Sequence, residues 1–429
     1  MPKKYNDAYL ATIKSLSDRI VEAQKPIRIL DAVKWDKNIK ETFFSSKFKK
    51  LPDIDKDYYA KHAPLAFDPA NKKAEFHDIE REISRKIGQL NPLSQIMRRI
   101  CREYQMVVRM LEARGTLEFS DISQELYGSA SEVFHAGDPS LAELGKMMES
   151  TLANLLQQQS MQEPAKILPA QTAVEVLNER LTPLFPDAGI RVILSDGIAA
   201  DAAAGTDYIK INKDAMFSQQ DIDVLEVHEG WVHLGTTLNG MAQPYCTFLS
   251  KGPPSVTVTQ EGLAVLTEIL TLRSSPTRLN KLINRVRAIT LAENGANFFE
   301  VFNYLREQGL GAEETWNLVS RIFRGSTPHL PPFTKDITYI KGFVLGYNYL
   351  RLSFARSKVE QLPMLFCGKL MLEDLPVYTE LVHEGVIVPP RFVPPHFRDL
   401  KGLGAWMSFS RFIGGLDFNQ LEADYNHLF

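Results

Sequence analysis

The sequence predicts a mostly helical α+β fold with a small mixed sheet in its second half. Apolar residues at helical spacing fill most of the first 165 residues, whereas helical segments alternate with short strand-like runs after that point. The length of 429 residues allows two or three domains, or one large domain with a helical extension. We place a boundary near residues 162–169. It separates an N-terminal helical region, 1–165, from a second domain, 166–429.

Periodicity and capping residues define the individual elements. Ser218 with Asp221 three residues later is typical of a helix N-terminus, and Asn239-Gly240 is typical of a helix C-terminus. The alternation in YIKI (208–211) indicates a strand. The other expected elements are helices over 7–21, 73–112, 140–159, 171–181 and 337–356, and strand-like stretches over 190–194 and 255–259.

Composition excludes several classes of protein. Lys and Arg total 49 against 52 Asp and Glu, and this balance argues against general nucleic-acid binding. The three cysteines form no CxxC pair, which excludes a cysteine zinc knuckle, and so sparse a count fits a reducing compartment. The N-terminus shows no apolar signal region, and no apolar stretch is long enough to span a bilayer. We therefore expect a cytoplasmic protein without membrane contact.

The motif that carries chemistry is H-E-x-x-x-H, formed by His228, Glu229 and His233. Nine histidines occur in the chain, and no other two lie within ten residues of each other. Zinc proteases commonly use H-E-x-x-H, which puts both histidines on one helix face. With one residue added, the two side chains lie about 140° apart on an ideal α-helix. The metal hypothesis thus predicts irregular backbone between 228 and 233, where Gly230 lowers the cost of distortion.

A third ligand is expected from T-Q-E-G-L-A, residues 259–264. Glu261 lies 28 positions after His233, and the small Gly262 and Ala264 are expected to let its helix approach the first one closely. We predict that His228, His233 and Glu261 hold one Zn²⁺ per chain with an open position for water.

Glu229 would then not be a ligand but the catalytic base that takes a proton from the water. The alternative is a non-catalytic regulatory or binding protein whose zinc site is structural. Glu229 counts against that alternative, because a structural site has no use for a buried carboxylate beside the metal.

These motifs resemble those of the QEGLA-motif family, often labelled flavohemoglobin expression-modulating. They also resemble the related microtubule-associated tyrosine carboxypeptidases, zinc enzymes that remove the C-terminal tyrosine of α-tubulin. The stretches RIFRG (321–325) and PFTKDITY (332–339) are similar to family motifs too. The resemblance implies the same roles for His228, His233, Glu261 and Glu229. It also implies a zincin-like catalytic domain with a glutamate third ligand.

The resemblance implies a metallocarboxypeptidase that removes a C-terminal residue, with an aromatic residue as the family-based expectation, from a peptide or protein. No long basic N-terminal arm is visible, so the sequence does not favour tubulin as the substrate. An enzyme of this kind must recognise a free carboxylate, which arginine does best. The candidate carboxylate-binding residues are Arg321, Arg324 and Lys335.

Tyrosine hydroxyls commonly stabilise the developing oxyanion, and Tyr339 and Tyr347 are the candidates. Asp336 or Glu226 is expected to orient a ligand histidine, since metal-bound histidine normally donates its other N–H to a carboxylate or carbonyl. A tandem Pro-Pro repeat over 388–397 is expected to be extended, with its phenylalanines as packing anchors.

Overall fold

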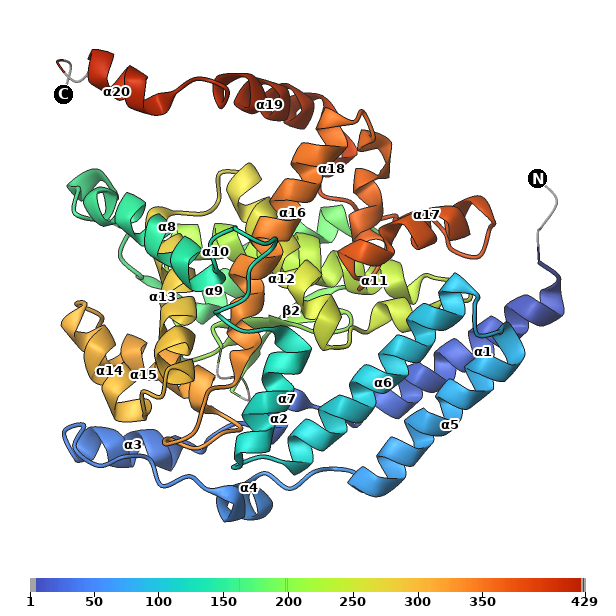
Figure 1. Cartoon of the computed structure of the whole chain (residues 1–429), viewed down its shortest axis with the longest axis horizontal. Helices are drawn as coiled ribbons and strands as arrows, with labels where there is room; N and C mark the ends of the chain where they lie inside the picture. The colour runs from blue at the N-terminus through green and yellow to red at the C-terminus, as the bar shows by residue number, and fades with distance from the viewer. Residues whose placement is uncertain (1–4, 162, 197, 199, 426, 428–429) are drawn as a thin grey trace.

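A computed structural model describes residues 5–161, 163–196, 198, 200–425 and 427. Helices predominate and two small sheets accompany them, so the expected mostly helical α+β class is confirmed (Figure 1). Among the described residues, no helix combines the length and the apolar character that crossing a membrane requires.

The N-terminal region is a set of helices in which α1, α5 and α6 lie side by side (Figure 1). The expected continuous pattern over 73–112 is wrong, because the chain breaks into two helices. Gly88 adopts a left-handed φ of 99°, and the Asn91 side chain accepts the N–H groups of Leu93 and Ser94 to start the second helix. The elements are α1 (Asp7–Gln24), α2 (Ile29–Ala32), α3 (Lys37–Ser45), α4 (Lys56–His62), α5 (Pro69–Ile87), α6 (Pro92–Glu112), α7 (Leu117–Tyr127), α8 (Leu141–Leu156) and η1 (Gln159–Met161).

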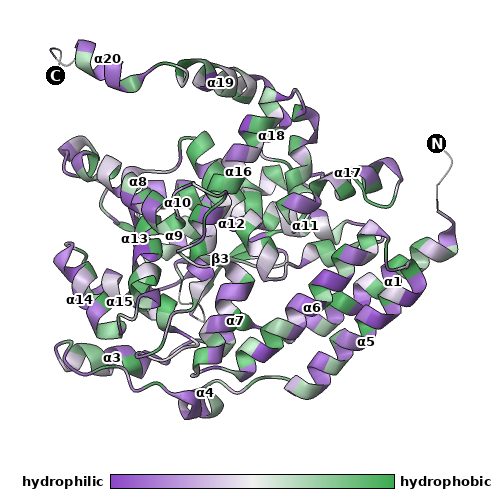
Figure 2. Ribbon diagram, viewed as in Figure 1, coloured by the Kyte–Doolittle hydropathy of each residue, from purple (hydrophilic) through white to green (hydrophobic). Residues whose placement is uncertain are grey.

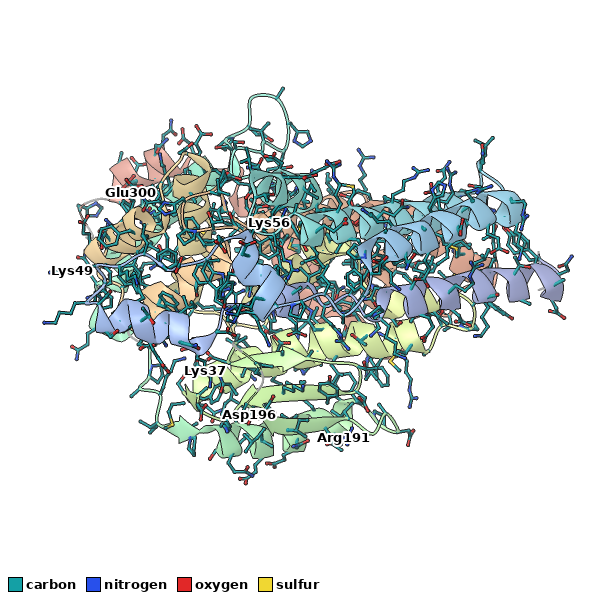
Figure 3. The ribbon with its side chains drawn as sticks, turned by 90° about the horizontal axis from the view of Figure 1, so that it is seen from below. Lys37, Lys49, Lys56, Arg191, Asp196 and Glu300 are labelled. Carbon is teal, nitrogen blue, oxygen red and sulfur yellow. The ribbon has the colours of Figure 1, made fainter. Side chains whose placement is uncertain are left out.

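The three-stranded sheet lies at one side of the helical body, the side where Arg191 and Asp196 are labelled in Figure 3. Its order is β2-β4-β3, with β2 parallel and β3 antiparallel to β4. Both strands expected at 190–194 and 208–211 are confirmed. The elements are β1 (Leu168–Pro169), α9 (Ala170–Leu181), η2 (Thr182–Leu184), β2 (Arg191–Ser195), β3 (Ala202–Ala204), β4 (Tyr208–Asn212) and β5 (Met216–Phe217).

The centre of the molecule is formed by α12 and α16, which pack against each other and carry mostly hydrophobic colour in Figure 2. The elements that follow the sheet are α10 (Gln219–Leu225), the π-helix η3 (Glu226–Leu234), α11 (Gly235–Met241), η4 (Thr247–Ser250), α12 (Pro254–Leu270), α13 (Pro276–Glu293), α14 (Phe298–Glu307), α15 (Ala312–Phe323), η5 (Thr334–Ile337), α16 (Thr338–Ala355), η6 (Val359–Phe366), η7 (Leu372–Asp374), α17 (Leu375–His383), α18 (Pro395–Arg398), α19 (Leu400–Ile413) and α20 (Phe418–Tyr425).

Two local expectations in this part of the chain are wrong. Residues 255–259 are not a strand, because Pro254 starts α12 and the β-branched Val256 is buried within it. Asn239 and Gly240 do not end their helix, which continues to Met241. The Asn239 amide instead donates to two distant backbone carbonyls, those of residues 366 and 392. The capping box of Ser218 and Asp221, in contrast, is confirmed.

Gly262 has a different partner from the one expected. It faces Gly342 of α16 rather than the helix of the H-E-x-x-x-H motif, and a Cβ added to it would lie 2.0 Å from the Gly342 carbonyl carbon. The backbones of α12 and α16 are therefore in direct contact. The largest hydrophobic cluster includes Val107 and Leu263, from either side of the expected boundary at 165/166. That division into two domains stays a prediction.

We expect Gly262→Ala to lower the free energy of unfolding by about 2–3 kcal/mol, because the added methyl group forces the two central helices apart. Gly402→Ala in α19 is the matched control, since a Cβ there meets nothing within 4 Å. It should leave stability unchanged or raise it by up to about 1 kcal/mol. Urea unfolding of both variants measures the difference, and equal stabilities would contradict the contact.

Candidate metal centre

The two motif histidines lie on η3, and the expected irregular backbone between 228 and 233 is confirmed as a π-helix. At its end the Gly235 N–H still donates to the Gly230 carbonyl, five residues back. This winding brings the rings of His228 and His233 together, with centroids 4.7 Å apart and planes at 85°. Gly230 is required for packing as well, because a Cβ there would lie 2.5 Å from the Leu181 side chain of α9.

Glu261 of α12 completes a three-residue group with the histidines. Its Oε2 lies 3.4 Å from Nε2 of His228 and 3.5 Å from Nε2 of His233. Two ligands of a tetrahedral zinc ion, each about 2.0–2.1 Å from it, are separated by roughly 3.4 Å. This Oε2 is buried without a hydrogen-bond partner among the described residues. The three side chains fit a shared cation, which would satisfy that oxygen.

A second carboxylate, that of Glu229, also lies within reach of the histidines. Ligand atoms of His228, Glu229 and His233 fall within 4.8 Å of one another. The Glu229 Oε2 already accepts the Ala204 N–H of β3 at 2.8 Å, whereas the Glu261 Oε2 is unpaired. The closer match to both Nε2 atoms therefore favours Glu261 as the third ligand and leaves Glu229 beside the centre.

The carboxylate that orients His228 is Glu268, which the sequence analysis missed. Its Oε1 lies 2.6 Å from the His228 Nδ1, and Arg278 donates to both of its oxygens at 3.0 and 3.1 Å. An Nδ1–H bound in this way leaves Nε2 free to face Glu261. Glu268 follows Glu261 by seven residues, two helical turns, and this spacing was the available signal.

Neither carboxylate expected in this orienting role fills it. Asp336 pairs with Arg321, and Glu226 pairs with Arg180 at 3.0 Å. Both of the expected assignments fail for the same reason: each carboxylate faces an arginine from another element, a long-range pairing that spacing along the chain does not reveal.

Charges at the centre are strongly coupled. Burial lowers the pKa of His228, but the nearby carboxylates of Glu261 and Glu268 outweigh burial and raise that pKa to about 10. Burial raises the pKa of Glu268, yet the Arg278 charge and His228 bring it down to about 2. The pKa of Glu261 is likewise held well below its usual range, mainly by the Lys335 charge acting against burial. A metal cation would displace the His228 proton, since histidine ligates metals in its neutral form.

The three candidate carboxylate-binding residues differ in what they already bind. Arg321 donates two hydrogen bonds to Asp336 at 2.7 and 3.0 Å, and Lys335 lies 3.3 Å from the Glu261 Oε1. Arg324 keeps a buried Nε without an acceptor among the described residues. Burial and the neighbouring Arg321 charge lower the Arg324 pKa to about 10. Of the three, Arg324 alone has a buried donor atom without any acceptor there.

Arg285 of α13 is a further, partly buried cation near the centre that the sequence did not indicate. Its guanidinium lies over the Tyr339 ring at 4.7 Å and only 3.9 Å from the carboxylate of Asp336. Its Nη1 is buried without an acceptor in the described part of the chain. Burial lowers the pKa of Arg285, with Arg321 as the next cause.

The shell of the centre carries an excess of positive charge. The cations around the centre are Arg278, Arg285, Arg321, Arg324, Lys335 and Lys369, and the carboxylates that face them are Glu229, Glu261, Glu268 and Asp336. Buried charges without partners are unfavourable unless a counter-ion meets them. The shell is thus suited to an anionic ligand.

The two candidate tyrosines lie in different places. The Tyr339 ring stacks near His228, with centroids 6.3 Å apart and planes at 25°. Tyr347 lies two turns further along α16, roughly 12 Å by helix rise, where its ring stacks on Phe343 at 6.0 Å. The structure brings Tyr339, and not Tyr347, beside the histidines.

The C-terminal Pro-Pro repeat packs against this half of the molecule. The Phe392 ring lies 5.1 Å from that of Phe185, and the Phe397 ring lies 4.9 Å from that of Phe366. The expectation that the phenylalanines act as anchors is confirmed. The second Pro-Pro is not extended throughout, because Pro395 begins α18.

Paired histidines, a buried glutamate and a cationic shell define a candidate metallohydrolase centre. A family model described as "Microtubule-associated tyrosine carboxypeptidase" matches residues 41–415. This chain belongs to that family, which is a family of carboxypeptidases, and the expected resemblance is confirmed. No curated protein matches the chain. A solved structure described as "The Structure of CHT" is 12% identical, with 91% of this chain and 94% of that chain covered and a TM-score of 0.30.

We expect Asp336→Asn to destabilise the fold by about 3 kcal/mol at pH 7, because Arg321 loses its buried carboxylate partner. The neighbouring arginines, above all Arg321, hold the pKa of Asp336 well below its usual range. The pair therefore stabilises the wild type above about pH 4, and its contribution is lost as pH falls through the folded-state pKa.

Denaturant unfolding at pH 7, 5 and 3 measures this effect. The difference between wild type and Asp336→Asn should be full at pH 7 and shrink toward pH 3. Asp121→Asn, at an exposed position of α7, is the matched control and should change little at any pH. A difference that does not depend on pH would contradict the charge pairing.

Proposed function

We propose that this protein is a zinc-dependent carboxypeptidase that removes one residue from the C-terminus of a peptide or protein. The observation that carries the proposal is the buried, unpaired Oε2 of Glu261, 3.4–3.5 Å from two imidazole nitrogens. Membership of a carboxypeptidase family supports the reaction type. Because the family's description names tyrosine, a C-terminal tyrosine is the first residue to test.

His228, His233 and Glu261 would hold the zinc ion, with Glu268 fixing the orientation of His228. Bound zinc would supply Lewis-acid polarisation of the scissile carbonyl and of the attacking water. Glu229, held in place by the Ala204 N–H, accepts a proton from that water and delivers it to the leaving amine.

The substrate's terminal carboxylate would bind to the unused donors of Arg285 and Arg324. A carboxylate accepts paired hydrogen bonds from a planar guanidinium, and burial makes such a bond stronger. Arg321 is already paired with Asp336, and Lys335 with Glu261. These two cations would therefore hold the neighbouring carboxylates in place instead of binding the substrate.

Tyr339, stacked near His228, would donate its hydroxyl hydrogen to the oxyanion that develops during attack. Tyr347 would not serve as this donor, because its ring packs on Phe343 further along α16. The microtubule association in the family's description does not by itself assign tubulin to this chain. The expectation that tubulin is not favoured stays a prediction.

We expect Glu229→Gln to lower kcat by about 10²–10⁴-fold while zinc content stays near one per chain, because the variant loses only the proton acceptor. Glu261→Gln should lose zinc as well as activity. Mass spectrometry of a tyrosine-ended peptide library measures the products, and elemental analysis measures the metal. Full activity of Glu229→Gln would contradict the mechanism. Bound zinc with no product from wild type would favour the non-catalytic zinc protein.

We expect Arg285→Gln and Arg324→Gln each to raise KM for a free-acid peptide by about 10–100-fold, through loss of charged hydrogen bonds to the terminal carboxylate. Arg81→Gln, at an exposed position of α5, is the matched control and should not change KM. The same peptide with an amidated C-terminus should not be cleaved by wild type. Equal cleavage of the free-acid and amidated peptides would show that no carboxylate pocket exists.

A further inference from the structure

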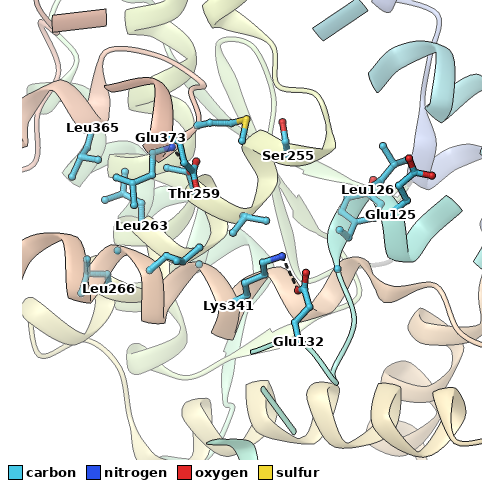
Figure 4. Close-up of a pocket in the computed structure, with 18 residues that line it drawn as sticks. Glu125, Leu126, Glu132, Ser255, Thr259, Leu263, Leu266, Lys341, Leu365 and Glu373 are labelled. Atoms are coloured by element: carbon cyan, nitrogen blue, oxygen red, sulfur yellow. Dashed lines mark hydrogen bonds and ion pairs between the residues drawn. The ribbon is translucent and has the colours of Figure 1, made fainter. Parts of the chain in front are cut away.

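A cavity of about 170 Å³ lies against the two central helices (Figure 4). It shares α12 and α16 with the metal centre, but none of the residues assigned to that centre lines it. Thr259 and Leu263 reach it from α12, on either side of Glu261 in the sequence. The cavity is therefore a separate site on the helices that carry Glu261 and Tyr339.

The interior of the cavity is apolar. Gly346 leaves room along α16, because it places no side chain there. An apolar cavity of about 150 Å³ is large enough to bind benzene. The space thus fits one ring or a chain of about six carbons. The aliphatic lining includes Leu126, Val258, Leu263, Leu266, Leu345 and Leu365.

The charged residues around the cavity are three carboxylates and one ammonium group. The Lys341 Nζ pairs with the Glu132 Oε2 at 2.7 Å, drawn as a dashed line in Figure 4. The other two, Glu125 and Glu373, are exposed and have no ion-pair partner among the described residues. The cavity is thus surrounded by net negative charge, which favours a cation over an anion.

We propose that this cavity binds a small organic cation, a primary ammonium group on an apolar body of about six carbons. The apolar body would fill the space between α12 and α16, and the ammonium group would meet Glu125 or Glu373 at the rim. The bound cation would contact α12 and α16, the two helices whose backbones touch at Gly262 and Gly342. The metal centre lies on those same helices, so the site is placed to influence it.

Direct binding to the full chain tests the proposal without relying on peptidase activity. Hexylammonium, 1-hexanol and hexanoate share one apolar body and differ in charge. Calorimetric titration at low salt should give the lowest Kd for hexylammonium, a higher one for hexanol and the highest for hexanoate. Hexanoate binding as tightly as hexylammonium would overturn the charge selection, and no binding by any probe would overturn the site.

Two kinds of variant locate the binding. The double variant Glu125→Gln with Glu373→Gln should raise the Kd of hexylammonium about three- to tenfold and leave that of hexanol unchanged. Glu307→Gln, at an exposed position of α14, is the charge control and should change neither. An unchanged Kd for hexylammonium in the double variant would overturn the role of the rim.

Gly346→Leu should abolish binding of all three probes by filling the cavity, since a Cβ there has ordinary contact with Leu266 at 3.4 Å. Leu345→Phe fills the same space from the neighbouring, half-buried position and serves if the first variant does not fold. Thermal unfolding checks that each variant is folded. Retained binding in a folded filling variant would place the probes elsewhere and overturn the assignment.

Discussion

The five-residue spacing of His228 and His233 is the constraint on which the candidate centre depends. On an α-helix these side chains point about 140° apart, so only π-helical winding brings both rings to one cation. A π-helix is rare and less favourable than an α-helix, and it persists where the surroundings hold it. Here Leu181 packs on Gly230 from one side, and α12 presents Glu261 from another.

Buried charge is the second constraint, and it connects the centre to its surroundings. Glu268 joins His228 to Arg278, and Asp336 neutralises Arg321, so these pairs stabilise a shell that would otherwise be unfavourable. Arg285 and Arg324 are left with unused donors. The excess of positive charge is unfavourable for the empty fold, but it allows the shell to bind an anion. A carboxypeptidase requires this property, because its substrate ends in a carboxylate.

Local chemistry could be predicted from the sequence, and long-range pairing could not. The spacing arithmetic predicted the distorted backbone at 228–233, and the capping box at Ser218 depends on neighbours only. Residues 255–259 were misassigned because burial inside the molecule overrides the strand preference of β-branched residues. The place of Arg285 over Tyr339 and the contact of Gly342 with Gly262 depend on distant helices coming together, which periodicity does not encode.

Anomalous X-ray diffraction at the zinc absorption edge, from crystals of the zinc-loaded protein, tests the central claim most directly. The account predicts one strong peak per chain, about 2.0–2.1 Å from the Nε2 atoms of His228 and His233 and from the Oε2 of Glu261. Glu229 should lie beside the peak without ligating it. A peak ligated by Glu229 in place of Glu261, or no peak between the two histidines, would contradict the account.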